Sequence, residues 1–186
     1  MLIVFFGVSC AGKTSIIRQL NTIIKTSPIN AYTTRPLRLY DVGRICVSLD
    51  QYEDLVQNGE IIWPVELYGH KYGISKSDIN ISLYDIHNIY TLDHRLVKNH
   101  ELENISSVNF LVYPSTIEDL KRFIYTAKRT ERSQQIITEY STICIDYYIK
   151  NRYIILHNEY GSLDLCVNHV YKELVERGFL GGNHQC

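Results

Sequence analysis

The sequence predicts an α/β protein, a P-loop fold in which a doubly wound parallel sheet carries a phosphate-binding loop after its first strand. Residues 7–14, GVSCAGKT, fit the pattern G-x-x-x-x-G-K-[ST] without a mismatch. An apolar run, residues 2–6, precedes them, and a helix-periodic run follows from residue 15. Strand and helix patterns then alternate along the chain. A strand before this motif and a helix after it are the context in which it binds phosphate.

The loop residues have distinct chemical roles. Gly7 and Gly12 allow the backbone N–H groups to approach phosphate oxygens, and the helix that follows directs its positive end to the same place. Lys13 supplies a cation for the outer phosphates, and the Thr14 hydroxyl is a ligand for Mg²⁺. We therefore predict an ATP site at Gly7, Ser9, Cys10, Ala11, Gly12, Lys13, Thr14 and Ser15.

Length and composition limit the other possibilities. The 186 residues are enough for one domain, and the net charge of −1 gives no basic excess for nucleic acid. The five cysteines are scattered and form no C-x-x-C pair, so we expect a reducing, cytoplasmic setting without disulfides. The first apolar run is too short for a membrane span. We expect a monomer or a homodimer without a membrane partner.

The first half of the chain alternates short elements. The first helix has apolar residues at helical spacing from Ile16 to Ile24, and Ser27-Pro28 is expected to end it. Short strands are expected at 31–34 and 46–49. The Ser48-x-x-Gln51 pattern predicts a capping box that opens the next helix. The remaining expectations here are a strand over 61–67 with an edge or bulge at Pro64, an aromatic turn at 68–73, and a short helix capped by Ser75.

The second half returns to a parallel-sheet pattern. Strands are expected at 86–92, 108–113 and 153–156. Ser115-x-x-Glu118 predicts a helix cap, and one long helix is expected to carry Ile136, Tyr140, Ile143 and Tyr147. The last helix should run past Leu174 and end at Gly178 as its C-terminal cap.

An arginine pair, Arg35 and Arg38, marks a possible second anion-binding site. Pro36 biases Arg35 toward an extended conformation, so Arg35 and Arg38 are not expected on one helix face. An extended pair can direct two guanidinium groups at a single anion, and a guanidinium binds phosphate through two hydrogen bonds.

The order of the motifs resembles guanylate kinase, a nucleoside-monophosphate kinase, over residues 2 to 176. Beyond the phosphate loop, the resemblance depends on several segments at the family's spacing. These are Thr33-Thr34-Arg35-x-x-Arg38, Gly59-Glu60, Tyr68-Gly69-x-x-Tyr72-Gly73, Pro114-Ser115 with Asp119-Leu120, and Asn158, where the family often has N-D-D.

The resemblance implies a single domain with three parts. A core, residues 1–31 and 83–186, would hold ATP, with Asn158 added to the phosphate loop. An inserted subdomain, about 32–82, would hold the monophosphate acceptor through Arg35, Arg38 and Tyr72. A lid, about 125–133, would close over the transferred group with Lys128, Arg129 and Arg132. The groups expected to stabilise transfer are Lys13, Arg35, Arg129 and Arg132, with Mg²⁺.

Several positions depart from the family pattern. Trp63 stands where a glutamate contacts guanine, and Glu66 has the wrong strand parity to replace it. Ala31 replaces a serine, and Arg44 falls near a phosphate-binding tyrosine, where its guanidinium is expected to bind the acceptor in its place. The family's L-D-x-D places Thr91 and Asp93 at the two acidic positions, so Asp93 would serve the acceptor, or the metal if the register shifts by two. An expected lid arginine is missing at residues 137–140.

Three hypotheses follow from these residues. The first is an ATP- and Mg²⁺-dependent kinase acting on GMP, dGMP or a related nucleoside monophosphate. The second is a kinase of another phosphorylated small molecule, similar to the ribose-bisphosphate kinases, which Trp63 and Ala31 fit. The third is a binding module without turnover, which Lys13 argues against because such modules usually lose this lysine. His70 is a weak candidate for a base contact, and Cys10 for a reactive thiol.

Overall fold

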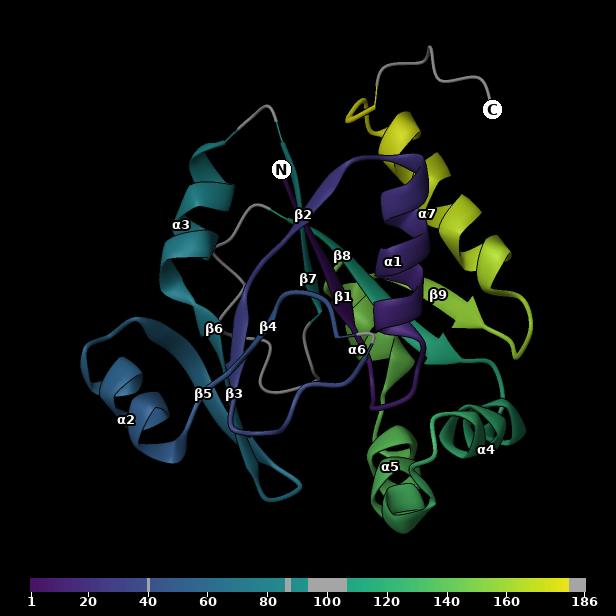
Figure 1. The fold of residues 1–186 in the computed structure, drawn as a ribbon. Coiled ribbons are helices and arrows are strands. Elements are labelled where there is room, and N and C mark those ends of the chain that lie inside the picture. Colours follow the sequence, from purple (N-terminus) through teal and green to yellow (C-terminus); the bar gives the residue numbers. More distant parts are fainter. Residues whose placement is uncertain (40, 86–87, 94–106, 181–186) are drawn as a thin grey trace. The chain divides into compact units, whose positions relative to one another are not determined.

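The computed structural model describes residues 1–39, 41–85, 88–93 and 107–180. It divides into two compact units (Figure 1). The first comprises Met1–Phe6 and Lys25–Asn109, and the second comprises Gly7–Ile24 and Phe110–Cys186. Each unit combines helices with strands paired in parallel, which confirms the predicted α/β class. The division into a core of 1–31 and 83–186 and a subdomain of 32–82 remains a prediction.

The first unit contains three parallel strands in the order β2–β7–β1. All five residues of β1 (Leu2–Phe6) are buried, as the apolar run predicted. It pairs with β7 (Ile89–Asp93), whose predicted start at 86–87 lies outside the described residues. We expected Ser27-Pro28 only to end the first helix, but β2 (Thr26–Pro28) is a strand on β7. Proline is tolerated there because β2 ends the strand order, where a strand has one partner.

The first unit also contains a four-stranded sheet in the order β4–β3–β6–β5. Its strands are β3 (Ala31–Thr33), β4 (Arg44–Cys46), β5 (Ile61–Leu67) and β6 (His70–Ser75). The strand predicted at 46–49 is instead β4, which ends at Cys46. It ends there because Ser48 already caps α2 (Leu49–Gln57) through the expected capping box with Gln51. Helix α2 packs against β5 (Figure 1). Ser75 caps α3 (Lys76–Tyr84), as predicted.

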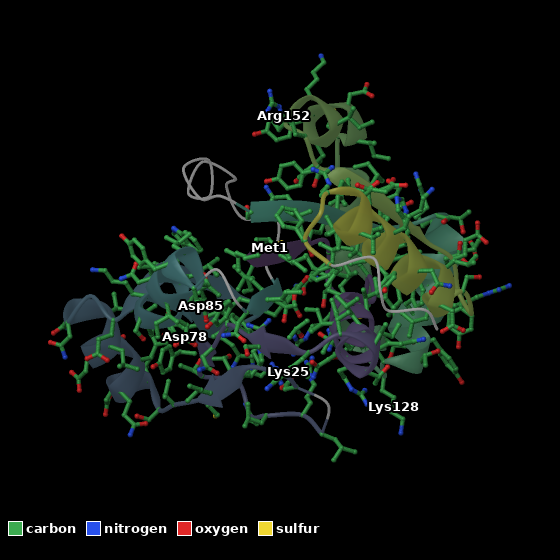
Figure 2. The ribbon with its side chains drawn as sticks, turned by 90° about the horizontal axis from the view of Figure 1, so that it is seen from above. Met1, Lys25, Asp78, Asp85, Lys128 and Arg152 are labelled. Atoms are coloured by element: carbon green, nitrogen blue, oxygen red, sulfur yellow. The ribbon has the colours of Figure 1, made fainter. Side chains whose placement is uncertain are left out.

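The N-terminal amine of Met1 ties the start of the chain to the same unit. It donates to the backbone carbonyls of Asp85 and Asn88 at 3.1 and 2.8 Å. Figure 2 labels Met1 and Asp85, and Asp78 marks the first turn of α3. These bonds anchor β1 beside the segment that leads into β7, so the strand before the phosphate loop is fixed at its outer end.

The second unit begins with α1 (Lys13–Ile23), which packs against α7 (Leu163–Glu176) (Figure 1). Its strands β8 (Ser107–Pro114) and β9 (Ile154–Asn158) pair in parallel. Gly178 has φ 75° and donates to the Val175 carbonyl, while Phe179 donates to Leu174. This pair of bonds is the Schellman arrangement, so the predicted glycine cap of the last helix is confirmed.

The predicted long helix through residues 136–147 is wrong. The chain instead forms a short 3₁₀ turn, η2 (Thr130–Arg132), then α5 (Ser133–Ser141) and a separate α6 (Ile145–Lys150). The hydroxyls of Ser141 and Thr142 donate back to the carbonyls of Thr138 and Glu139. Such back-bonds compete with helix continuation, which explains why the apolar periodicity runs through a break.

The predicted cap at Ser115 is also displaced by one residue. Helix α4 (Ile117–Thr126) is capped by Thr116, whose hydroxyl accepts from the Asp119 amide at 3.0 Å. Ser115 is still bound to the preceding strand pair, because its amide donates to the Asn158 carbonyl. Its hydroxyl is buried and has no hydrogen-bond partner within the described part of the chain.

Two variants distinguish these neighbouring hydroxyls. Thr116→Ala should lower the free energy of unfolding by about 1 kcal/mol, the usual value of an N-terminal cap. Ser115→Ala, the matched control, should leave stability unchanged or raise it, since it removes a buried hydroxyl without a partner. Urea unfolding of both variants measures the difference. A larger loss for Ser115→Ala would contradict the assignment of the cap to Thr116.

Candidate active site: two phosphate-binding clusters

The phosphate loop adopts a conformation that its glycines make possible. Gly7 and Gly12 have φ of 148° and 99°. A Cβ atom on Gly7 would lie 2.5 Å from the Val112 carbonyl oxygen, and one on Gly12 would collide with the Asn158 amide. Cys10 also has a positive φ, 66°. The loop therefore requires glycine at both positions for space as well as for backbone freedom.

Lys13 is held inside this loop. It is only 6% exposed, and its Nζ donates to the carbonyls of Gly7 and Val8 at 2.7 and 2.9 Å. A buried ammonium group is costly unless it is well bonded, so the position favours a strong anionic ligand. Thr14 is half-buried and Ser15 exposed in the first turn of α1, where the positive end of the helix lies.

Asn158 ends β9 and is 2% exposed. Its Nδ2 donates to the Ala11 carbonyl at 2.8 Å. The sequence predicted Asn158 as an ATP-binding residue, and the structure places it against the loop backbone. Direct contact with ATP remains a prediction. The Sγ atom of buried Cys166, on α7, lies 3.5 Å from Asn158 Oδ1 and donates to it.

The predicted lid cations divide into three environments. Arg129 Nη1 donates to Ser9 Oγ at 2.7 Å, so one lid arginine reaches the phosphate loop. Arg132 has an ion pair with Glu131 at 3.5 Å. Lys128 is exposed, has φ 52°, and lies at the periphery of its unit (Figure 2). The structure therefore joins Arg129 to a predicted ATP-site residue by a hydrogen bond.

The first unit contains the predicted acceptor residues. Arg35 is 7% exposed, its Nη2 donates to Asp41 Oδ2 at 2.7 Å, and its Nη1 donates to the Pro36 carbonyl at 2.6 Å. The Arg38 amide donates to the same Asp41 oxygen at 2.8 Å, while the Arg38 side chain is exposed. The two arginines are thus joined through one carboxylate.

Asp41 is the partner of the arginine pair that the sequence did not predict. Burial alone would raise its pKa, but the Arg38 amide and the Arg35 guanidinium together hold the pKa below its ordinary value. Asp41 is therefore ionised at neutral pH and fixes the Arg35 side chain. The available signal was an acidic residue within a short loop after an arginine pair, just before Gly43.

A second ion pair joins two more predicted residues. Arg44, on β4, lies 3.5 Å from Asp93 Oδ2 and also donates to the Asp93 backbone carbonyl at 3.4 Å. Both side chains are less than one-fifth exposed. Thr91, two residues earlier on β7, is buried, so it is not presented to solvent as a ligand. The carboxylate available at this strand end is therefore partly neutralised by Arg44.

Trp63 lies in a β-bulge, which confirms the bulge predicted at Pro64. Ile62 pairs with Ile74 and Val65 with Tyr72, so β5 contains one extra residue between these pairs. Trp63 has φ 52°, a costly conformation for a bulky side chain. The expected parity of Glu66 relative to Trp63 is wrong, because the bulge shifts the alternation of side chains by one residue.

Tyr72 lies beside β3, the strand that leads into Arg35. It pairs with Thr33 across β3 and β6, and directly opposed residues of an antiparallel pair share a face of the sheet. Its carbonyl accepts from the Tyr52 hydroxyl at 2.6 Å. His70 begins β6, half-buried. Contacts of Tyr72, Trp63 or His70 with an acceptor remain predictions.

The described residues fit Mg²⁺ only as an ion that arrives with its nucleotide. No group of three histidine, cysteine or acidic residues that could hold a metal occurs in the parts of the chain that the structure describes. Mg²⁺ usually takes one or two protein ligands together with substrate phosphates and water. The Thr14 hydroxyl meets that requirement in the second unit, while the Asp93 carboxylate, in the first unit, forms an ion pair with Arg44.

Across residues 1–39, 41–85, 88–93 and 107–180, no helix has the length and apolar character of a membrane span.

Comparisons with known proteins agree with the motifs. Two curated guanylate kinases of Legionella pneumophila, from the strains Paris and Lens, are each 23% identical to this chain over 160 residues. Each match covers 82% of this chain and 76% of the relative. The crystal structure of guanylate kinase from Anaplasma phagocytophilum has a TM-score of 0.69 at 17% identity and covers 95% of this chain and 85% of its own. No protein-family model matches the sequence. The predicted resemblance is confirmed, as that of a divergent relative.

Proposed function

We propose that this divergent guanylate-kinase-like chain transfers the γ-phosphoryl group of ATP to a nucleoside monophosphate, with GMP or dGMP as the acceptor. The observation that carries the proposal is the buried Lys13 inside a glycine-dependent loop, with Arg129 bonded to Ser9 of the same loop. Such a loop collects backbone N–H groups and one ammonium around the outer phosphates of a triphosphate.

The donor half supplies charge neutralisation. Lys13 and Arg129 compensate the negative charge of the transferred group, and the first turn of α1 adds the partial charge of its N–H groups. The Thr14 hydroxyl would hold Mg²⁺ beside the phosphates of bound ATP, where the ion would supply further charge neutralisation. Phosphoryl transfer needs such positioning and electrostatics more than it needs a base.

The acceptor half supplies phosphate recognition. Arg35, fixed by Asp41, and the exposed Arg38 provide two guanidinium groups beside a strand that carries Tyr72. A guanidinium held in one orientation loses less conformational entropy when it binds a phosphate.

The direct test is ADP release from ATP and Mg²⁺ with a panel of monophosphates. Turnover that depends on GMP or dGMP would support the proposal. Turnover with only another phosphorylated small molecule, such as a ribose bisphosphate, would instead support a different kinase on this fold, an alternative that Trp63 and Ala31 fit. Bound ATP without turnover for any acceptor would identify a binding module.

A narrower prediction concerns Trp63. A carboxylate accepts two hydrogen bonds from the N1 and N2 donors of guanine, whereas an indole can only stack or donate one. Trp63→Glu should therefore raise the kcat/KM ratio of GMP over other monophosphates by about tenfold or more.

Trp63→Gln is the matched control, because it changes the bulge in the same way without adding a charge. Steady-state kinetics with GMP and AMP give the ratios. An unchanged ratio in Trp63→Glu would show that Trp63 does not occupy the base-reading position.

A further inference from the structure

The Asn158 side chain is bonded to the backbone of the phosphate loop. Its Nδ2 donates to the Ala11 carbonyl at 2.8 Å, and the same nitrogen occupies the space that a Cβ atom on Gly12 would need. The peptide unit between Ala11 and Gly12 is planar and trans, so its N–H points in the opposite direction from its carbonyl. A carbonyl directed at Asn158 therefore turns the Gly12 N–H away from Asn158.

Cys166 in turn orients the amide of Asn158. Its Sγ lies 3.5 Å from Asn158 Oδ1 and 3.4 Å from the His157 carbonyl oxygen, so these two acceptors share its single proton. Burial, with a smaller effect from Glu159, raises the pKa of this thiol to about 11, so it remains protonated at neutral pH. With the thiol on Oδ1, the NH₂ end of the side chain must face Ala11.

We propose that Asn158 is a positioning residue that locks the Ala11–Gly12 peptide in the orientation in which the Gly12 N–H faces a bound triphosphate, and that Cys166 fixes Asn158 for this task. A flipped peptide would present a carbonyl oxygen to the phosphates in place of a donor. Glycine at position 12 makes such a flip possible, because it lacks Cβ and tolerates either sign of φ. The hydrogen bond from Asn158 to the Ala11 carbonyl opposes this flip.

The inference depends on the proposed triphosphate site, and its test uses binding in place of turnover. Asn158→Asp is nearly isosteric but changes the donor. A protonated aspartic acid can still donate to the Ala11 carbonyl, whereas an ionised one only accepts and repels that oxygen. Burial raises the pKa of such a carboxyl. Raising the pH should therefore ionise the variant side chain and release the peptide.

Isothermal titration of the full chain with MgATP at pH 5 to 9 measures this effect. At the lowest pH, the affinity of Asn158→Asp should be within about threefold of wild type. At high pH it should be weaker by about tenfold or more, the usual effect of one lost hydrogen bond to a charged partner. Ratios to wild type at each pH remove the titration of ATP itself. Cys166→Ser, which keeps a donor, should bind ATP like wild type, and Cys166→Ala should bind more weakly.

The control variant is Asn151→Asp. The Nδ2 of Asn151 also donates to a backbone carbonyl, that of Tyr147 at 2.7 Å, but Asn151 is exposed, at the C-terminal cap of α6. It should show no pH-dependent loss of ATP affinity. A flat affinity ratio for Asn158→Asp across the pH range, or a loss of thermal stability without a change in affinity, would overturn the inference. Failure of wild type to bind MgATP would instead overturn the proposed function.

Discussion

Replacing Lys13 with methionine is expected to reduce kcat by about a hundredfold to a thousandfold, the usual effect of removing one group that stabilises transition-state charge. Methionine keeps the length and the apolar stem of lysine. The variant therefore removes the ammonium that now donates to the Gly7 and Val8 carbonyls but leaves the packing of α1 in place. The loss should appear with every acceptor, since Lys13 belongs to the donor half.

Folding should survive this change. Removing a buried charge also removes its desolvation cost, so the melting temperature should stay within a few degrees of wild type. Lys150→Met, an exposed lysine at the end of α6, is the matched control and should keep full turnover. The measurements are ADP release, MgATP titration and thermal unfolding. Turnover within threefold of wild type in Lys13→Met would show that the loop is not the donor site.

The donor loop could be predicted from sequence because its requirements are local. Four residues separate Gly7 from Gly12, Lys13 follows directly as the first residue of the helix, and the strand before the loop is apolar throughout. The capping box at Ser48 and the glycine cap at Gly178 were predictable for the same reason. In each case the residues that decide the structure lie within one turn of each other.

The contacts that complete the loop are not local. Asn158 reaches Ala11 across 147 positions, and Arg129 reaches Ser9 across 120. Sequence pattern marked these residues through their resemblance to a family but gave no partner for either. The prediction of one continuous helix across α5 and α6 failed for another reason. Apolar periodicity continues through residues 141–144, while hydroxyl back-bonds, which periodicity does not register, end the helix.

The charged cluster of the first unit, which we propose binds the acceptor, was predicted least completely, because its charges are arranged by tertiary contacts. The arginine pair was recognised, but its carboxylate partner Asp41 was not. Arg44 and Asp93 were each assigned a separate role, and the structure pairs them. The parity argument at Glu66 failed because one inserted residue in β5 changes the face of every side chain after it.

Arg35 provides the second large effect. Arg35→Ala should raise the KM for the monophosphate by about tenfold to a hundredfold, the range expected for lost hydrogen bonds to a charged group, with a smaller change in the KM for ATP. It should also lower the free energy of unfolding by about 2 kcal/mol, because it leaves Asp41 half-buried without its guanidinium partner. Arg35→Lys should restore part of the stability but not the bidentate contact.

The double variant Arg35→Ala/Asp41→Ala separates the two effects. It removes both charges, so stability should recover toward wild type while the KM for the monophosphate stays high. Recovery of both would show that Arg35 serves the fold alone.

The pH dependence of stability gives an independent check on the same pair. The pKa of Asp41 lies below its ordinary value of 3.8 in the folded chain, so the Asp41 carboxylate stabilises the protein above that value. This contribution is lost as the pH falls through the lowered pKa. The stability difference between wild type and Asp41→Asn should therefore be greatest and constant above about pH 5 and should shrink in more acidic solution. Urea unfolding from pH 2.5 to 7 measures it. A difference that grows toward low pH would contradict the ion pair, because only a carboxylate stabilised by its partners loses its contribution on protonation.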